Sequence, residues 1–440
     1  MLVKLQSDTL LSKVSNLGDL EAKLSSFGWI VSRCDGNNLQ EFSEVLASIK
    51  KINKGPNIII ADTIKGKGVS FMEHTSVDLD KINYEYHSGA PKKDEYLNAI
   101  EELKISINKK LKTRELELKT IKIPSAKSSK NTQNLIQAYS KALIRQAQNK
   151  PNIVALDADL VLDTGLIPFK KQFPSRFVEC GIAEQDMVSQ AGGMALNGLL
   201  PIVHSFACFL SARPNEQIYN NATEKSKIIY VGSLAGVIPG GPGHSHQAVR
   251  DLSTLAGIPN LTLMEPCCEK EVDLLLDWCI NKNSESSYIR ITPLQLEISF
   301  DYPKNYIPEL GKGTVLKEGQ DAVIIAYGPV MLSLAIDTSK HLQKEGISVK
   351  VVNIPWLNTI KVKWFREVIN DIKIVISIDN HYSIGGQGDR ISRVLTYTQS
   401  RSKFKSISIN NIPPCGNNQE VLNVLEMNKE NISKLIKEEL

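Results

Sequence analysis

Hydrophobic positions between residues 131 and 298 alternate between short apolar runs and longer helical patterns. The runs IVALDAD, LPIVHSF and KIIYVGS predict buried strands, because an unbroken apolar run suits a strand that is covered on both faces. Helical spacing is predicted over 131–148, from Glu184 to Ala195, and over NEQIYNNAT. Strands that alternate with helices predict an α/β fold with a mostly parallel sheet.

A second alternating set follows a change of composition at 299–313. The runs AVIIAYGPV, SVKVVNIPW and KIVISIDN predict strands, and helical patterns separate them. This region predicts a separate and smaller C-terminal α/β domain over 305–440. Its Gly-Gly-Gln-Gly turn at 385–388 suits an anion-binding helix start, but such a glycine cluster alone is a weak signal, and we assign no catalytic residue there.

The first 100 residues predict only about half of a doubly wound sheet domain. Strands are predicted at WIVSRCDG and PNIIIADT, and helices around LGDLEAKLSSF and over 38–53. The Lys- and Ser-rich stretch 103–130 is typical of a solvated helix that runs into a linker, with a boundary near 125. The expected domains are therefore 1–120, 125–298 and 305–440.

Composition excludes several classes of protein. The chain has 440 residues, 42% of them hydrophobic, which is ordinary for a globular protein. Lys plus Arg exceeds Asp plus Glu by 52 to 48, and the excess lies in 103–130, so nucleic-acid binding has little support. Seven cysteines without a CxxC pair indicate reduced thiols, a cytoplasmic protein and no zinc site. The most apolar windows contain Pro, Gly, Asn or His, so no membrane span is predicted.

Residues 176–213 combine an acid at the start of an apolar helix with a closely spaced phenylalanine pair. Because an apolar helical wall disfavours the charged form of an acid, we expect Glu184 to be suited to hold or share a proton near neutral pH. Phe206 and Phe209 could clamp a flat heterocycle. The alternatives are that Glu184 only complements the helix dipole and that the phenylalanines are plain core.

Two further segments carry histidine or aspartate side chains, which can act in catalysis or binding, at the predicted ends of strands. The glycine-rich loop 232–251 contains His244 and His246, which are either a metal pair, one catalytic imidazole beside a structural one, or incidental histidines of a turn. No third metal ligand is evident nearby. Asp157 and Asp159 follow the first strand of this region, where either could cap the next turn.

The stretch 176–213 resembles the pyrimidine-binding domain of transketolase, a family that uses thiamine diphosphate. The resemblance spans essentially the whole chain and is strongest at 65–71, 181–195 and 232–251. It implies that Glu184 contacts a ring nitrogen of the cofactor's pyrimidine and that Phe206 and Phe209 hold that ring. It also gives the His246-Gln247 pair a contact with the reacting end of the donor sugar.

The resemblance assigns roles to four other candidates. Asp159 fits a family residue at the boundary of cofactor and subunit. His87 fits a histidine near the cofactor's diphosphate and the substrate, and the alternative is an ordinary histidine of a surface loop. Arg290 fits an arginine that binds the substrate's phosphate, although an arginine at a strand end is often a solvated edge. His244 has no family counterpart and is kept as a candidate substrate-binding residue.

The first 100 residues resemble the final third of the family's diphosphate-binding domain. The matching segments are 4–6, 35–36, 65–70 and 87–89. The family binds a magnesium ion through a Gly-Asp-Gly segment and a later Asn, and this sequence contains no Gly-Asp-Gly. We therefore expect a truncated diphosphate-binding domain without metal ligands; the look-alike at Asp35-Gly36-Asn37 predicts a turn.

The resemblance implies transfer of a two-carbon ketol unit from a ketose to an aldose by a homodimer that needs a companion chain for its magnesium site. Sugars or sugar phosphates are the expected substrates. Gln133 and Asp163 stand near positions where the family holds a sugar phosphate, which favours an unphosphorylated or nucleotide-linked sugar. Three alternatives stay open: a 1-deoxyxylulose-5-phosphate synthase-like enzyme, the E1 β-subunit of a 2-oxoacid dehydrogenase, and an inactive remnant that serves only as a dimer partner.

Overall fold

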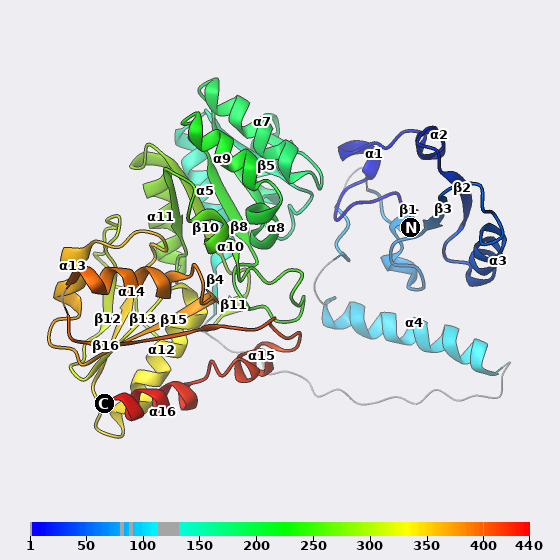
Figure 1. Ribbon diagram of the computed structural model, residues 1–440. Coiled ribbons are helices and arrows are strands. Elements are labelled where there is room, and N and C mark those ends of the chain that lie inside the picture. Colours follow the sequence, from blue (N-terminus) through cyan, green and yellow to red (C-terminus); the bar gives the residue numbers. More distant parts are fainter. Residues whose placement is uncertain (1, 80–82, 88–90, 113–131, 399) are drawn as a thin grey trace. The chain divides into compact units, whose positions relative to one another are not determined.

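The computed structural model describes residues 2–79, 83–87, 91–112, 132–398 and 400–440 (Figure 1). The chain divides into two compact units, residues 1–128 and 129–440, and each is described by itself. The predicted linker and the boundary near 125 fall within 113–131, outside the described residues.

The first unit is built on a small parallel sheet. Its strand order is β1-β3-β2, with β2 paired in parallel to β3 from Ile30↔Asn57 to Asp35↔Asp62. The strands and helices predicted from the sequence are present in this unit. Their bounds are β1 (Leu2–Val3), α1 (Leu11–Val14), α2 (Leu20–Ser26), β2 (Ile30–Asp35), α3 (Leu39–Ile49), β3 (Asn57–Thr63), η1 (Ser70–Met72), η2 (His74–Ser76) and α4 (Lys93–Lys112).

Two segments of this unit that the resemblance singled out lie together. Nζ of Lys65 donates to the backbone carbonyls of Gln6 and Ser7, both at 2.7 Å, and lies 4.9 Å from the centroid of the Tyr84 ring. The predicted turn after β2 is also present, since the backbone N–H of Asn37 donates to Oδ1 of Asp35 at 2.8 Å.

The second unit contains a six-stranded sheet in which every pairing is parallel. The strand order is β6-β5-β7-β8-β10-β9. The strands are β5 (Ile153–Asp157), β6 (Phe177–Glu179), β7 (Leu200–Phe206), β8 (Ile229–Ser233), β9 (Leu261–Met264) and β10 (Ser286–Ile291). The mostly parallel sheet predicted from the alternating pattern is thus confirmed.

Helices cover both faces of this sheet. One face packs against α5 (Leu135–Asn149), α6 (Ile167–Gln172) and α11 (Glu269–Asn281). The other packs against α7 (Glu184–Leu196), α8 (Ala207–Ala212), α9 (Asn215–Thr223) and α10 (Asp251–Leu255). A short 3-10 helix, η3 (Pro174–Arg176), precedes β6, and β4 (Gln133–Asn134) pairs antiparallel with β11 (Gln295–Leu296).

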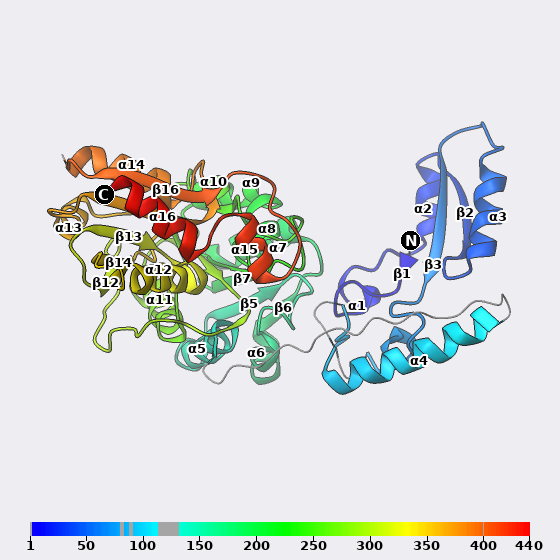
Figure 2. The ribbon, with the colours of Figure 1, turned by 90° about the horizontal axis from the view of Figure 1, so that it is seen from below.

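A five-stranded sheet follows, with the order β12-β14-β13-β15-β16 and one antiparallel edge strand, β12. Helices α12 and α16 pack together on one face (Figure 2), and α13 and α14 cover the other. The bounds are β12 (Thr314–Lys317), β13 (Ala322–Ala326), α12 (Gly328–Gln343), β14 (Val349–Asn353), α13 (Val362–Val368), β15 (Ile374–Tyr382), α14 (Gln387–Thr398), β16 (Lys403–Ile409), α15 (Asn418–Val424) and α16 (Lys429–Glu439).

The two large sheets share a hydrophobic core. Trp278 of α11 meets Trp356, which follows β14, with ring centroids 4.8 Å apart and the rings edge to face. Such aromatic contacts bury large apolar areas and join the two sheets into one unit. In the described part of the chain, no helix combines the length and apolar character needed to cross a membrane.

Candidate functional site

The candidate residues of the second unit gather at the carboxyl ends of its parallel strands. Asp157 of β5 pairs with His204 of β7, and Phe206 at the end of β7 pairs with Ser233 at the end of β8. Loops at this edge of a parallel sheet form the usual ligand site of α/β proteins. The sheet therefore brings Glu184, the phenylalanine pair and the loop 232–251 into one neighbourhood.

Glu184 is the first residue of α7 and is only 3% exposed. Its Oε1 accepts hydrogen bonds from Ser205 Oγ at 3.2 Å and from Arg213 Nη1 at 2.7 Å. A buried carboxylate needs such partners because burial without them is costly. The contacts come from β7 and from the end of α8, so Glu184 does more than complement the dipole of its own helix.

Four flat side chains meet beside this acid. The rings of Phe206 and Phe209 have centroids 5.9 Å apart, and the imidazole of His246 lies 5.9 Å from the first and 5.3 Å from the second. The Arg213 guanidinium carbon lies 3.9 Å from the centroid of Phe209. Phe206 is buried, whereas Phe209 keeps part of its ring exposed. An aromatic wall next to a buried acid can bind a flat, nitrogen-containing heterocycle.

His246 is half-buried in the loop that follows β8. Burial lowers the pKa of its imidazole, the cation of Arg213 lowers it further, and the carboxylate of Asp163 acts in the opposite direction. The ring is therefore neutral at pH 7, and its Nδ1 lies 2.9 Å from Ser245 Oγ. A neutral imidazole can both donate and accept a hydrogen bond, which suits contact with a hydroxylated substrate.

His244 is exposed on the same loop and lines a cavity of about 570 Å³ together with Phe209, Arg213 and Arg250. Within the described ranges, no group of three or more His, Cys, Asp or Glu side chains is arranged to hold a metal ion. The metal-pair interpretation of the two histidines thus gains no third ligand from these residues.

Asp157 and Asp159 lie at the end of β5, and both are buried. Asp157 caps the following turn, because its carboxylate accepts from the Leu160 N–H at 2.6 Å and from Thr164 Oγ1 at 2.9 Å. The backbone N–H of Asp159 donates to Oε1 of Glu179 at 2.8 Å. Burial and the nearby charge of Asp159 raise the pKa of Glu179 to about 7.

Arg290 is fully buried in β10, so the interpretation as a solvated strand edge is wrong. Strand β10 is an interior strand, and the guanidinium lies between two carboxylates, with Nε 2.8 Å from Asp251 and Nη1 2.7 Å from Glu265. A substrate phosphate would have to displace these partners. This geometry favours a structural role for Arg290 over phosphate binding.

His87 belongs to the first unit and is exposed. Its expected proximity to a bound diphosphate stays a prediction, because each unit is described by itself. Of its segment 87–89, residues 88 and 89 lie outside the described residues.

Family models for two domains match the second unit. The transketolase pyrimidine-binding domain matches residues 131–297, and the transketolase C-terminal domain matches 311–432. The chain belongs to the transketolase family. This confirms the resemblance drawn from the motifs around Glu184 and His246.

Relatives and solved structures of the transketolase family agree with this assignment. The 1-deoxy-D-xylulose-5-phosphate synthase of Carboxydothermus hydrogenoformans is 28% identical over 402 residues, which are 90% of this chain and 58% of that protein. The synthase of Caldanaerobacter subterraneus is 30% identical over 82% of this chain and 52% of its own length. The chain spans about half the length of the curated relatives it matches.

Two solved structures are also similar. A split-gene transketolase, described as an inactive β4 tetramer, has a TM-score of 0.64 and 29% identity, and the match covers 70% of this chain and 98% of that one. A transketolase from Campylobacter jejuni has a TM-score of 0.59 and 19% identity over 97% of this chain and 70% of its own, which shows the shared fold.

Sequence reasoning missed Arg213 and Ser205, which contact Glu184, and Glu179, which contacts Asp159. Arg213 follows Phe209 by four residues, a spacing that places two side chains on one face of a helix, and this signal was available. Ser205 and Glu179 occupy strand positions whose contact with the site depends on the pairing of β5, β6 and β7. Their roles could be found only from the fold.

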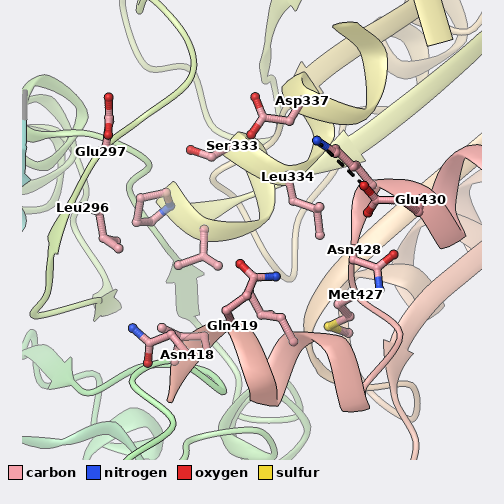
Figure 3. A pocket seen from close by; sticks show the side chains of 15 residues that line it. Leu296, Glu297, Ser333, Leu334, Asp337, Asn418, Gln419, Met427, Asn428 and Glu430 are labelled. Carbon is pink, nitrogen blue, oxygen red and sulfur yellow. Dashed lines mark ion pairs between the residues drawn. The ribbon is translucent and has the colours of Figure 1, made fainter. Parts of the chain in front are cut away.

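A second cavity, of about 490 Å³, lies beside α12 (Figure 3). It is formed by α12, α15, the start of α16, the segment that carries Glu297 and Ile238 of the loop 232–251, and none of the candidate catalytic or binding side chains lines it. Its polar side chains include Ser333, Asp337 and Asn418, and on its rim Lys429 pairs with Glu430 at 3.8 Å. The cavity therefore borders the loop 232–251 but contains none of the candidate side chains of the site.

Proposed function

We propose that this chain provides the pyrimidine-binding half of a thiamine-diphosphate-dependent transferase that moves a two-carbon ketol unit from a ketose to an aldose. The observation that carries the proposal is the buried acid Glu184 beside the rings of Phe206, Phe209 and His246. An acid and an aromatic wall are what an aminopyrimidine needs for a ring-nitrogen hydrogen bond and for stacking.

The described residues suit the pyrimidine end of the cofactor. Thiamine diphosphate, when bound, supplies a carbon nucleophile and stabilises the negative charge left on the two-carbon fragment. Glu184 would hold a proton against the pyrimidine ring nitrogen. Phe206 and Phe209 would bind the ring and keep water away from it, while the neutral His246 would orient a hydroxyl of the donor sugar.

Arg213 limits how a pyrimidine ring can reach the Glu184 carboxylate. Its guanidinium already bonds Oε1 of Glu184 and covers one face of Phe209. A pyrimidine that bonds this oxygen must share it with Arg213 or displace the guanidinium. Ser205, the other partner, can rotate its hydroxyl and so adapt to either arrangement.

A second candidate function is synthesis of 1-deoxy-D-xylulose 5-phosphate, and the names of the curated relatives favour it. The two products differ at one carbon, because a deoxy sugar ends in a methyl group where a transferred ketol unit ends in a hydroxymethyl group. Mass analysis of the product formed from an aldose therefore separates the two functions.

We also propose that the active enzyme includes a companion chain that brings the magnesium and diphosphate site. The similarity to a split-gene transketolase described as an inactive β4 tetramer supports this arrangement. A homodimer of this chain would then present the pyrimidine ends, and sugars or sugar phosphates would be the substrates.

The decisive experiment measures thiamine diphosphate binding by calorimetry and ketol transfer by product analysis, with and without an N-terminal transketolase chain that contains a Gly-Asp-Gly segment. We expect the isolated chain to bind thiamine diphosphate feebly and to show negligible turnover. With the companion chain, we expect both cofactor binding and ketol transfer. Robust magnesium-dependent turnover by the isolated chain would contradict the proposal that a companion chain is needed. A fully assembled complex that binds no cofactor would favour an inactive dimer partner instead.

A further inference from the structure

The C-terminal sheet places one side chain inside the loop that carries His246. Asn380, near the end of β15, is 1% exposed, and its Oδ1 accepts the backbone N–H of Val237 at 2.9 Å. The neighbouring Gly236 has a φ of 81°, and a Cβ at that position would lie 1.9 Å from Nδ2 of Asn380. Only glycine leaves room for the amide here, so Asn380 and Gly236 fit each other closely.

Further contacts hold the other limb of the same loop, after His246. The backbone N–H of Tyr382 donates to the Val249 carbonyl at 2.8 Å. Nη2 of Arg290 donates to the Ala248 carbonyl at 2.9 Å and to the Asn380 carbonyl at 3.2 Å. The end of β15 thus contacts the loop both before and after His246.

The charges around Asn380 require a neutral side chain at this position. Asp251, Glu265 and Asp379 are buried around the guanidinium of Arg290, and the nearby Asn380 amide acts against the rise in the pKa of Glu265 that burial causes. A carboxylate in place of this amide would add a fourth buried acid. An amide supplies the acceptor for Val237 without adding charge.

We propose that Asn380 is a positioning residue of the candidate site: by filling the space beside Gly236 and bonding Val237, it fixes the loop that holds His246 against Phe209. The C-terminal sheet then takes part in arranging the site. The consequence for sugar transfer rests on the proposed function, whereas the placement of His246 does not.

Two variants disrupt the contact between Asn380 and Gly236, one at each residue, and each has a matched control. Asn380→Ala removes the amide, and Asn353→Ala removes another buried amide of the same sheet, which bonds Glu271 of α11 at 2.8 Å and does not touch the loop. Gly236→Ala forces a methyl group against Asn380. Gly241→Ala adds the same methyl group to the same loop, where nothing lies within 4 Å.

The readout is the Cε1–Hε1 NMR signal of His246 in the full chain, assigned by its loss in His246→Gln. We expect Asn380→Ala and Gly236→Ala to shift this signal and to move its titration midpoint upward, because a loosened loop exposes the ring and moves it away from Arg213. The two controls should leave the signal in place. If Asn380→Ala does not fold, Gly236→Ala decides alone.

An unchanged His246 signal in the test variants, or equal changes in tests and controls, would overturn the proposal. In the assembled enzyme we expect Asn380→Ala to lower kcat/KM for the sugar by about tenfold, the loss typical of one buried hydrogen bond, with unchanged cofactor affinity. Weakened cofactor binding together with an unshifted His246 signal would also count against it. If neither the wild-type assembly nor any variant turns over sugar, the proposed function fails. The NMR result still tests whether Asn380 positions His246.

Discussion

Nη1 of Arg213 lies 2.7 Å from Oε1 of Glu184, and its guanidinium also covers the ring of Phe209. One side chain thus links the buried acid to the aromatic wall. The acid is 3% exposed and the arginine 40% exposed, so the pair lies at the boundary between the protein interior and solvent. Its strength therefore falls between that of a surface ion pair and that of a fully buried one.

Glu184→Gln should fold normally, because an amide oxygen can still accept from Arg213 and Ser205. In an assembly with its companion chain, turnover should fall at least ~100-fold, as expected for loss of a group that holds a proton in the reaction. The control is Glu216→Gln on the exposed side of α9, which should retain activity. Turnover near the wild-type level in Glu184→Gln would remove this residue from the mechanism.

Arg213→Ala should lower the free energy of unfolding by about 1–2 kcal/mol, since it leaves the buried Glu184 without its cation; partial exposure of the arginine reduces the full cost of breaking a buried pair. Urea denaturation measures this change. The double variant Arg213→Ala/Glu184→Gln should recover part of the loss, because no charge is then left without its partner. Strictly additive effects in this cycle would show that the two side chains do not interact.

Phe206→Ala and Phe209→Ala should each weaken thiamine diphosphate binding by about 1 kcal/mol or more through lost stacking and buried area. Phe206 is 5% exposed, so its replacement should also cost more stability than that of the half-buried Phe209. Calorimetry and thermal unfolding separate the two effects. Unchanged affinity combined with a large loss of stability would identify the pair as plain core.

Glu265 should make stability depend on pH. Burial is the main reason that its folded pKa is raised to about 7, and the charges of Asp251 and Asp379 add to the rise. The folded state then binds this proton more tightly than the unfolded state, so the contribution is complete below about pH 4.5 and is lost as pH rises through about 7. Glu265→Gln should flatten the fall of unfolding free energy between pH 5 and 8.

The expected size of this effect is roughly 3 kcal/mol across that interval, from about 1.4 kcal/mol per pKa unit. Urea titrations at several pH values measure it. Glu179→Gln is the comparison, because the pKa of Glu179 is also raised to about 7 at a different place in the sheet. A slope that survives both replacements would assign the pH dependence to other groups.

The sequence alone determined the α/β alternation, the start of α7 at Glu184 and the spacing of Phe206 and Phe209. These features are local: apolar runs bury strands, helical spacing buries one helix face, and the chain itself holds two phenylalanines three residues apart. The motifs around them were sufficient to identify the family, which the family models confirm.

Only the tertiary structure decided which side chains surround these residues. Arg290 looked like a substrate ligand at a strand end, but the strand order places it inside the sheet between Asp251 and Glu265. Asn380 lies 134 residues beyond His246 in the sequence, and no local pattern connects the two. Contacts between distant segments depend on how sheets and helices pack, and packing is a property of the whole unit rather than of any stretch of sequence.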